Sequence, residues 1–160
     1  MAVGSEKNYV DRTLLAGVLD WLLRRRTDDP SGRFSLTLIK FENPSRLGEE
    51  YGAQRASRLL DQFGLTVVGA LRMGDLVTRM LSTFWVLTPT SNIDTLLARL
   101  RSVIADGAED GLRMLDYSVR SYDFPNVLAN DMNGADLLAA LEMGSLLHPD
   151  HYIDGSHGSS

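Results

Sequence analysis

Cysteine is absent from the 160 residues of the sequence. Disulfide bonds are therefore excluded, and the composition fits a reducing compartment. Long apolar runs are lacking too, since none approaches the roughly 20 residues that a membrane-spanning helix needs. Residues 1–11 show no signal-peptide pattern. These absences favour a cytoplasmic domain, either on its own or tethered to a larger or membrane-associated protein.

An excess of positive charge is also missing, because the sequence has 16 Lys and Arg residues but 21 Asp and Glu residues, so that its net charge is −5. Proteins that coat nucleic-acid polymers need a basic surface, so that class is excluded. What is present is 44% hydrophobic residues in a chain about one domain long. We expect one folded domain over residues 1–147. Residues 148–160 are expected to be a flexible C-terminal tail or the remnant of a purification tag.

Hydrophobic periodicity predicts helices and strands that alternate along the chain. The expected helices span residues 13–26, 49–71, 92–105 and 135–143, and the expected strands span residues 34–41, 75–80, 84–88 and 112–124. A strand over residues 65–71 is the alternative to the end of the second helix, because Gly64, Gly69 and the Thr66-Val67-Val68 cluster lower helix propensity. This order of elements favours an α+β fold in which helices back one face of an antiparallel or mixed sheet.

Short segments in this order resemble those of one known family. They are Asp11 with Leu14, residues 36–42 (Leu-Thr-Leu-Ile-Lys-Phe-Glu), Tyr51-Gly52, residues 71–79 (Leu-Arg-Met-Gly-Asp-Leu-Val-Thr-Arg), Val86-Leu87-Thr88-Pro89 and Ala135-Asp136-Leu137-Leu138. The spacing is ungapped from Phe34 to Trp85, and from about Asp11 to Gly144 the chain resembles a GGDEF domain, the fold of diguanylate cyclases. The resemblance implies a nucleotidyl-cyclase palm-like α/β sandwich, with about five mostly antiparallel strands flanked by helices.

The same alignment departs from the family where catalysis takes place. The family holds its metal ions partly with an Asp of the first strand and partly with an acid of the signature turn, and these positions are Lys40 and Thr83 here. The Gly-Gly-Asp-Glu-Phe signature aligns with Leu81-Ser82-Thr83-Phe84-Trp85. The guanine-reading Asn aligns with Gly48, although the nearby acid remains as Glu49. Since a Lys ammonium cannot ligate Mg²⁺, we expect a degenerate active site with no catalytic residue, no metal and no cofactor.

The site that the family uses for product inhibition keeps its pattern. Its Arg-x-x-Asp motif corresponds to Arg72 and Asp75. A guanidinium can donate two hydrogen bonds to O6 and N7 of a guanine, and a carboxylate can accept from N1 and N2. The resemblance implies that the pair binds cyclic di-GMP, usually as an intercalated dimer. A second arginine would complete the site, with Arg101 preferred over Arg99, and Arg79 could contact a phosphate.

We therefore predict a catalytically inactive GGDEF domain that is a cyclic di-GMP receptor and transmits the signal to a partner protein, to a domain of a larger chain or through a homodimer. Control of exopolysaccharide production or biofilm formation is suggested by analogy at the level of the fold. Two alternatives remain open: a ligand-free scaffold for protein interaction or dimerisation, and a residual enzyme that works through Glu42 and Glu49. We expect Phe84 to point outward, over the former active site or towards a partner, and Trp21 and Trp85 to pack in the core or against the hairpin.

Overall fold

The computed structural model describes residues 6–28, 33–72, 74–89, 93–107, 115–124, 132–144 and 148–155. Its helices are η1 (Glu6–Asn8, a 3-10 helix), α1 (Arg12–Asp28), α2 (Ser45–Tyr51), α3 (Ala53–Ala70), α4 (Ile93–Gly107) and α5 (Gly134–Glu142). Its strands are β1 (Phe34–Phe41), β2 (Leu76–Met80), β3 (Thr83–Thr88), β4 (Tyr117–Phe124) and β5 (His151–Gly155). Among these residues, no helix is both long and apolar enough to cross a bilayer.

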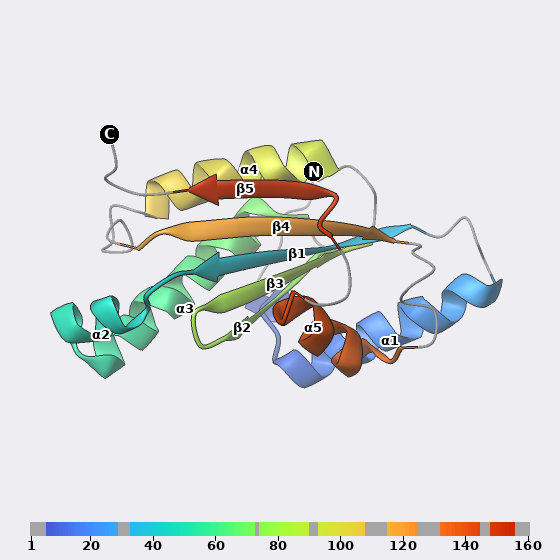
Figure 1. The fold of residues 1–160 in the computed structure, drawn as a ribbon, viewed down its shortest axis with the longest axis horizontal. Coiled ribbons are helices and arrows are strands. Elements are labelled where there is room, and N and C mark those ends of the chain that lie inside the picture. The colour runs from blue at the N-terminus through green and yellow to red at the C-terminus, as the bar shows by residue number, and fades with distance from the viewer. Residues whose placement is uncertain are drawn as a thin grey trace.

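The five strands form one sheet in the order β2-β3-β1-β4-β5, and every neighbouring pair is antiparallel (Figure 1). β1 lies at the centre, and all of its side chains except that of Lys40 are buried. A strand that is apolar on both faces needs a cover on each side and therefore belongs in the interior of a domain. The arrangement confirms the predicted α+β class and the predicted sheet of about five antiparallel strands flanked by helices.

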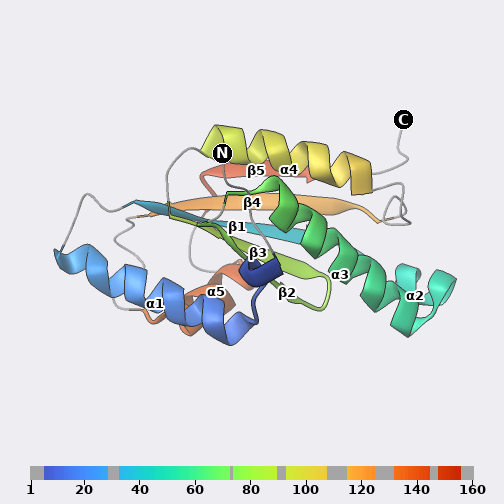
Figure 2. The same ribbon diagram turned by 180° about the vertical axis from the view of Figure 1, so that it is seen from behind.

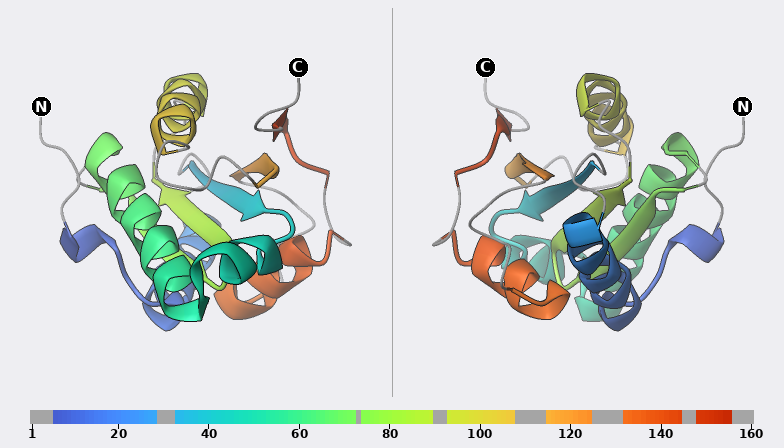
Figure 3. Two further views of the ribbon diagram at one scale, coloured as in Figure 1. Left: turned by 90° about the vertical axis from the view of Figure 1, so that its left-hand side faces the viewer. Right: turned by 90° about the vertical axis from the view of Figure 1, so that its right-hand side faces the viewer.

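Helices cover both faces of the sheet, so the expectation that helices back one face is wrong (Figure 3). α3 and α4 pack on the face to which Ile39 and Phe41 of β1 contribute. α1 and α5 pack on the other face, to which Leu36 and Leu38 contribute. Successive side chains of a strand point to opposite faces, and apolar residues occupy both sets of positions in β1. Two hydrophobic cores result, one on each face of the sheet.

Most expected elements are confirmed, and the differences concern their extent. α3 continues to Ala70, so the alternative strand over residues 65–71 is wrong. Gly52, with a φ of +84°, separates α2 from α3 where one helix was expected, and this conformation suits glycine. Residues 151–155 form β5 and pair with β4, so the expected flexible tail is wrong for this part. Residues 156–160, and the expected start of β4 at residues 112–114, lie outside the described residues.

The two tryptophans occupy opposite environments. Trp85 of β3 is fully buried, as expected, and its indole nitrogen donates a hydrogen bond to Glu142 at 3.2 Å. Glu142 also accepts hydrogen bonds from both terminal nitrogens of the Arg12 guanidinium, so one carboxylate links α1, α5 and β3. Trp21 on α1 is 53% exposed. Its expected place in the core is therefore wrong, because it lies on the side of α1 that faces away from the sheet.

Candidate functional site

Arg72 and Asp75 lie in the tight turn that connects α3 to β2. The Asp75 amide donates a hydrogen bond to the Arg72 carbonyl at 3.1 Å, and the Arg72 amide donates to the Asp75 carboxylate oxygen Oδ2 at 3.0 Å. The two residues therefore close the turn from both sides. Their side chains differ in exposure, because Asp75 is buried while Arg72 is partly exposed.

The Asp75 carboxylate primarily holds this turn together. The residue is only 5% exposed. Burial raises the pKa of its carboxyl group, while the hydrogen bond from the Arg72 amide and the positive charges of Arg72 and Arg99 oppose that rise. To accept hydrogen bonds from a guanine, the carboxylate has to rotate outward. Such a step lowers the apparent affinity of any ligand that requires it.

Two arginines of α4 were candidates to complete the site, and the structure separates them. The charges that act on the Asp75 carboxyl group are those of Arg72 and Arg99. Arg99 is partly exposed, whereas Arg101 is exposed. Because positions 99 and 101 lie roughly 200° apart around a helix, α4 directs only one of them towards the turn. The geometry therefore favours Arg99 over Arg101, and a role of either in binding stays a prediction.

A short N-terminal arm, Asn8–Val10, contacts the back of the same turn. The Asn8 side-chain amide donates a hydrogen bond to the Asp75 carbonyl at 2.7 Å, and the Val10 amide donates to the Val77 carbonyl at 2.8 Å. Sequence analysis missed this contact, because Asn8 and Asp75 are 67 positions apart and no local pattern signals such a pair. The arm therefore supports the predicted ligand turn through two hydrogen bonds to its backbone and to β2.

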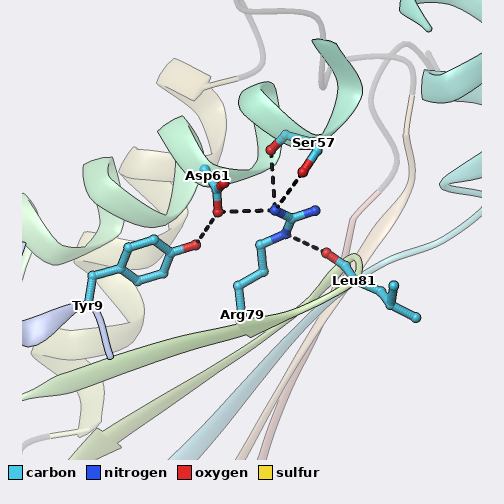
Figure 4. Close-up of polar contacts among 5 residues, drawn as sticks. All are labelled: Tyr9, Ser57, Asp61, Arg79 and Leu81. Carbon is cyan, nitrogen blue, oxygen red and sulfur yellow. Dashed lines mark hydrogen bonds and ion pairs between the residues drawn. The ribbon is translucent and has the colours of Figure 1, made fainter. Parts of the chain in front are cut away.

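Arg79 belongs to a separate network on the α3 side of β2 (Figure 4). Its guanidinium donates hydrogen bonds to Ser57 and Asp61 of α3 and to the Leu81 carbonyl. Asp61 also accepts from the Tyr9 hydroxyl at 2.8 Å. Burial, followed by the contact with Asp61, raises the pKa of Tyr9. The Arg79 guanidinium is thus engaged by protein oxygens, which contrasts with its predicted contact to a ligand phosphate.

The turn between β2 and β3 consists of Leu81 and Ser82, at the position of the family signature. Leu81 has a φ of +56°, which strains a leucine, and it is 78% exposed. Ser82 is buried, and its carbonyl accepts a hydrogen bond from the Phe41 amide at 3.1 Å. Phe84 is fully buried against Phe41 and Phe63. The prediction that Phe84 points outward is therefore wrong, because the pleat of β3 directs it into the core beneath α3.

The position at which the resemblance predicts metal ligands offers poor ones. Lys40 of β1 lies opposite Thr83 of β3, and both side chains are partly exposed. Mg²⁺ requires several hard oxygen donors, whereas a hydroxyl is a weak neutral ligand and an ammonium group repels a divalent cation. In the part of the chain that the structure describes, no group of three or more His, Asp and Glu side chains could hold a metal ion. The residues present at this position therefore do not fit magnesium.

The predicted guanine-pocket positions lie on α2, next to the N-terminal end of α3, whereas the Arg72–Asp75 turn follows the C-terminal end of α3 (Figure 2). Leu47 is fully buried and anchors α2 to the core beneath α3 and α4. Gly48 is partly exposed, and Glu49 is exposed. Glu42, at the end of β1, is exposed as well, and its amide donates a hydrogen bond to the Asp116 carbonyl. These acids are accessible to solvent, and a role in nucleotide binding stays a prediction for each of them.

Replacing Asp75 with Asn tests whether the buried negative charge destabilises the folded state. The amide oxygen can still accept the hydrogen bond from the Arg72 amide. Because the folded state raises the pKa of Asp75 above its ordinary value of 3.8, the ionised carboxylate lowers stability as the pH rises above that value. We expect Asp75→Asn to melt at the same temperature as the wild type or higher, with a difference that grows between about pH 4 and pH 7. Circular dichroism melts over this range check it, and a variant that loses stability relative to the wild type as the pH rises contradicts it.

Comparison with known proteins identifies the fold through solved structures alone. No family model matches the sequence, and no curated protein matches it. The GGDEF domain of YfiN (TpbB) from Pseudomonas aeruginosa is 18% identical, with a TM-score of 0.64 over 86% of this chain and 88% of that chain. The active GGEEF domain of a diguanylate cyclase from Vibrio cholerae is 12% identical, with a TM-score of 0.65 over 83% of this chain and 86% of that chain.

A third similar structure contains a bound nucleotide. The GGDEF domain of DgcB from Caulobacter crescentus, in complex with c-di-GMP, is 12% identical, with a TM-score of 0.61 over 88% of this chain and 90% of that chain. Identities this low establish similarity of fold. The chain therefore has a GGDEF-like fold, which confirms the predicted fold and leaves its ligand and its activity to be argued from the site.

Proposed function

We propose that the chain is a catalytically inactive GGDEF domain that acts as a cyclic di-GMP receptor through the Arg72–Asp75 turn. One observation carries the proposal: Arg72 and Asp75 lie in a single turn, in which the Arg72 amide donates a hydrogen bond to the Asp75 carboxylate at 3.0 Å. The positive charges of Arg72 and Arg99 also lower the pKa of that carboxyl group. Guanidinium groups supply donors for guanine edges or phosphates, and a carboxylate supplies an acceptor for guanine N1 and N2. This combination suits a compact anion that carries guanine.

The choice of ligand is supported by analogy with proteins of similar fold, among them DgcB, whose structure is a complex with c-di-GMP. On the same analogy the ligand binds as an intercalated dimer, and the signal passes to a partner protein or to another domain of a larger chain. A cytoplasmic location and a role in exopolysaccharide or biofilm control belong to the proposal at the level of fold analogy.

Isothermal titration calorimetry with cyclic di-GMP tests the proposal. We expect the wild type to bind, and Arg72→Ala and Arg99→Ala each to bind roughly 10- to 100-fold more weakly, because each substitution removes charge-assisted hydrogen bonds. Arg101→Ala is the matched control on the same helix, since it removes an exposed charge that does not act on Asp75. Asp75→Asn should also bind more weakly, because an amide cannot accept from both guanine donors as a carboxylate does.

Two results would overturn the receptor proposal. One is the absence of any binding heat at ligand concentrations up to roughly 100 μM. The other is an unchanged affinity in a variant that combines Arg72→Ala with Asp75→Asn. Since Asp75→Asn is expected to keep or raise thermal stability, weaker binding by that variant cannot be assigned to unfolding.

The absence of catalysis is a separate part of the proposal. It rests on Lys40 and Thr83, which stand where the family places carboxylates and which do not fit magnesium. Incubation with GTP and Mg²⁺, followed by chromatography of the nucleotides, should yield no cyclic product. Any accumulation of cyclic di-GMP would instead support the residual enzyme that works through Glu42 and Glu49.

A ligand-free interaction scaffold is the second candidate, and the 5% exposure of Asp75 favours it. In that case the carboxylate serves the turn alone, and the Arg72 side chain is an ordinary solvated cation. The scaffold predicts no calorimetric signal with cyclic di-GMP. It also predicts that the melting temperature stays the same when the nucleotide is added, whereas a receptor is stabilised by its ligand.

A further inference from the structure

Helix α1 has a second group of apolar side chains, on the side away from the sheet, that is about half-exposed in the part of the chain that the structure describes. Its inner face carries Leu15 and Leu19, which are fully buried beneath the sheet. On the opposite side Leu14 is 51% exposed and Trp21 is 53% exposed. Together with Gly17 and Val18 they form an outer stripe, whose members recur three or four residues apart on one side of the helix. Val18 lies at the border of this stripe, since it is partly buried and also packs against the inner core. A helix that is apolar on two sides usually has a neighbour on each.

The outer stripe is hollowed rather than flat. A hollow of about 510 Å³ is lined by Asp11, Thr13, Leu14, Gly17, Val18 and Trp21. A second hollow, of about 450 Å³, lies on the other flank of Gly17, between α1 and α5. Among the described residues, none has a heavy atom within 4 Å of the place that a Cβ atom on Gly17 would take. The backbone of α1 is therefore open at its midpoint, where another helix can approach closely.

The order of residues in the stripe is self-complementary. If a second α1 lies antiparallel across the first, with the two-fold axis between positions 17 and 18, Leu14 of one copy faces Trp21 of the other. Gly17 of one copy then faces Val18 of the other. The small residues therefore meet at the crossing point, and each large side chain reaches a leucine of the other copy. A two-fold interface requires this kind of self-matching surface.

Charge follows the same symmetry. In this register Asp11 faces Arg24 of the other copy, which places opposite charges at both ends of the interface. Arg24 is 74% exposed and pairs with Asp20 of its own helix at 3.1 Å. An exposed ion pair of this kind contributes little to stability. The Arg24 guanidinium can therefore also form an ion pair with an acidic side chain of the second copy. A parallel arrangement would instead place Asp11 beside Asp11 and Arg24 beside Arg24, which is unfavourable.

We propose that a second copy of this chain docks on the outer stripe, with the two α1 helices antiparallel and crossing at Gly17 and Val18. The inference is independent of nucleotide binding, because the Arg72–Asp75 turn takes no part in it. One helix face covers less than the roughly 800 Å² per partner of a standard interface. The dimer is therefore weak, and its population depends on protein concentration.

Cysteine cross-linking tests the register directly, because the chain has no cysteine of its own. Gly17→Cys should form a disulfide-linked dimer on mild oxidation, since the two positions meet at the crossing point. Leu14→Cys mixed with Trp21→Cys should give a mixed dimer, whereas Leu14→Cys alone should stay monomeric. In the antiparallel register two copies of position 14 lie roughly 10 Å apart along the axis, beyond the reach of a disulfide.

Sedimentation velocity over a concentration series gives a second measurement that needs no cross-link. We expect Leu14→Ala to reduce self-association at least about threefold, because it removes buried apolar area at both ends of the interface. The matched control is Leu65→Ala on α3, whose leucine is 39% exposed outside the stripe and should leave association unchanged. The proposal is overturned if Leu14→Cys links to itself as readily as to Trp21→Cys, if the wild type stays monomeric at the highest concentration, or if both alanine variants associate equally.

Discussion

Phe84→Ala is expected to lower the free energy of unfolding by about 3–5 kcal/mol. The ring is fully buried and lies edge-on to two other rings, with centroid distances of 5.2 Å to Phe63 and 6.2 Å to Phe41. Its removal leaves a cavity in the core beneath α3 and also removes these aromatic contacts. Urea denaturation followed by tryptophan fluorescence and circular dichroism measures the loss.

The neighbouring turn residue supplies the control for this prediction. Leu81 is 78% exposed, so Leu81→Ala should change stability by no more than about 0.5 kcal/mol. Phe84→Glu, which restores the family's acid at the aligned position, should be more damaging than Phe84→Ala because it buries an unpaired charge. If Phe84→Ala and Leu81→Ala had equal effects, the assignment of Phe84 to the core would be wrong.

Gly134→Ala is expected to destabilise the domain by at least about 3 kcal/mol. A Cβ atom at this position would lie close to the backbone of α1, 2.9 Å from the Asp20 nitrogen and in overlap with the Ala16 carbonyl oxygen. Backbone atoms cannot rotate away as a flexible side chain can, so α5 would have to separate from α1. That separation would also strain the contact between Arg12 and Glu142, which joins the same two helices.

Thermal unfolding of Gly134→Ala beside Gly69→Ala separates steric overlap from helix propensity. Gly69 lies inside α3, where a Cβ atom would meet nothing within 4 Å. Alanine should therefore stabilise that position by roughly 0.5–1 kcal/mol. Opposite signs for the two substitutions are the expected result. A Gly134→Ala protein with the melting temperature of the wild type would show that α1 and α5 are not packed as described.

Those parts of the fold that local patterns determine were predictable from the sequence. The bounds of β1 follow from apolar residues that alternate with polar ones over Phe34–Leu38 and then occupy both faces, and α4 follows from regular helical spacing. β5 was missed because His151–Gly155 is short and only Tyr152 and Ile153 among its five residues are strong strand formers. Its pairing with β4 depends on the shape of the finished sheet, which a local pattern does not contain.

The candidate site, too, was predictable only where local sequence patterns determine it. The motif predicted Arg72 and Asp75 as a pair, and the structure places both residues in one turn. The burial of Asp75 could not be predicted, because Asn8, which contacts the turn, is 67 positions away in the sequence. The direction of Phe84 was mistaken for a related reason. Which face a strand residue takes depends on the register with β1, and that register becomes known only when the strands have paired.

The N-terminal arm also affects how the sheet can grow. β2 lies at one margin of the sheet, and there the Val10 amide already occupies the Val77 carbonyl. A strand of another molecule that pairs with β2 at Val77 would have to displace Asn8–Val10 first. Among the described strands, β5 forms the opposite margin. A peptide that binds beside β2 by β-augmentation therefore has to compete with the N-terminal arm at Val77.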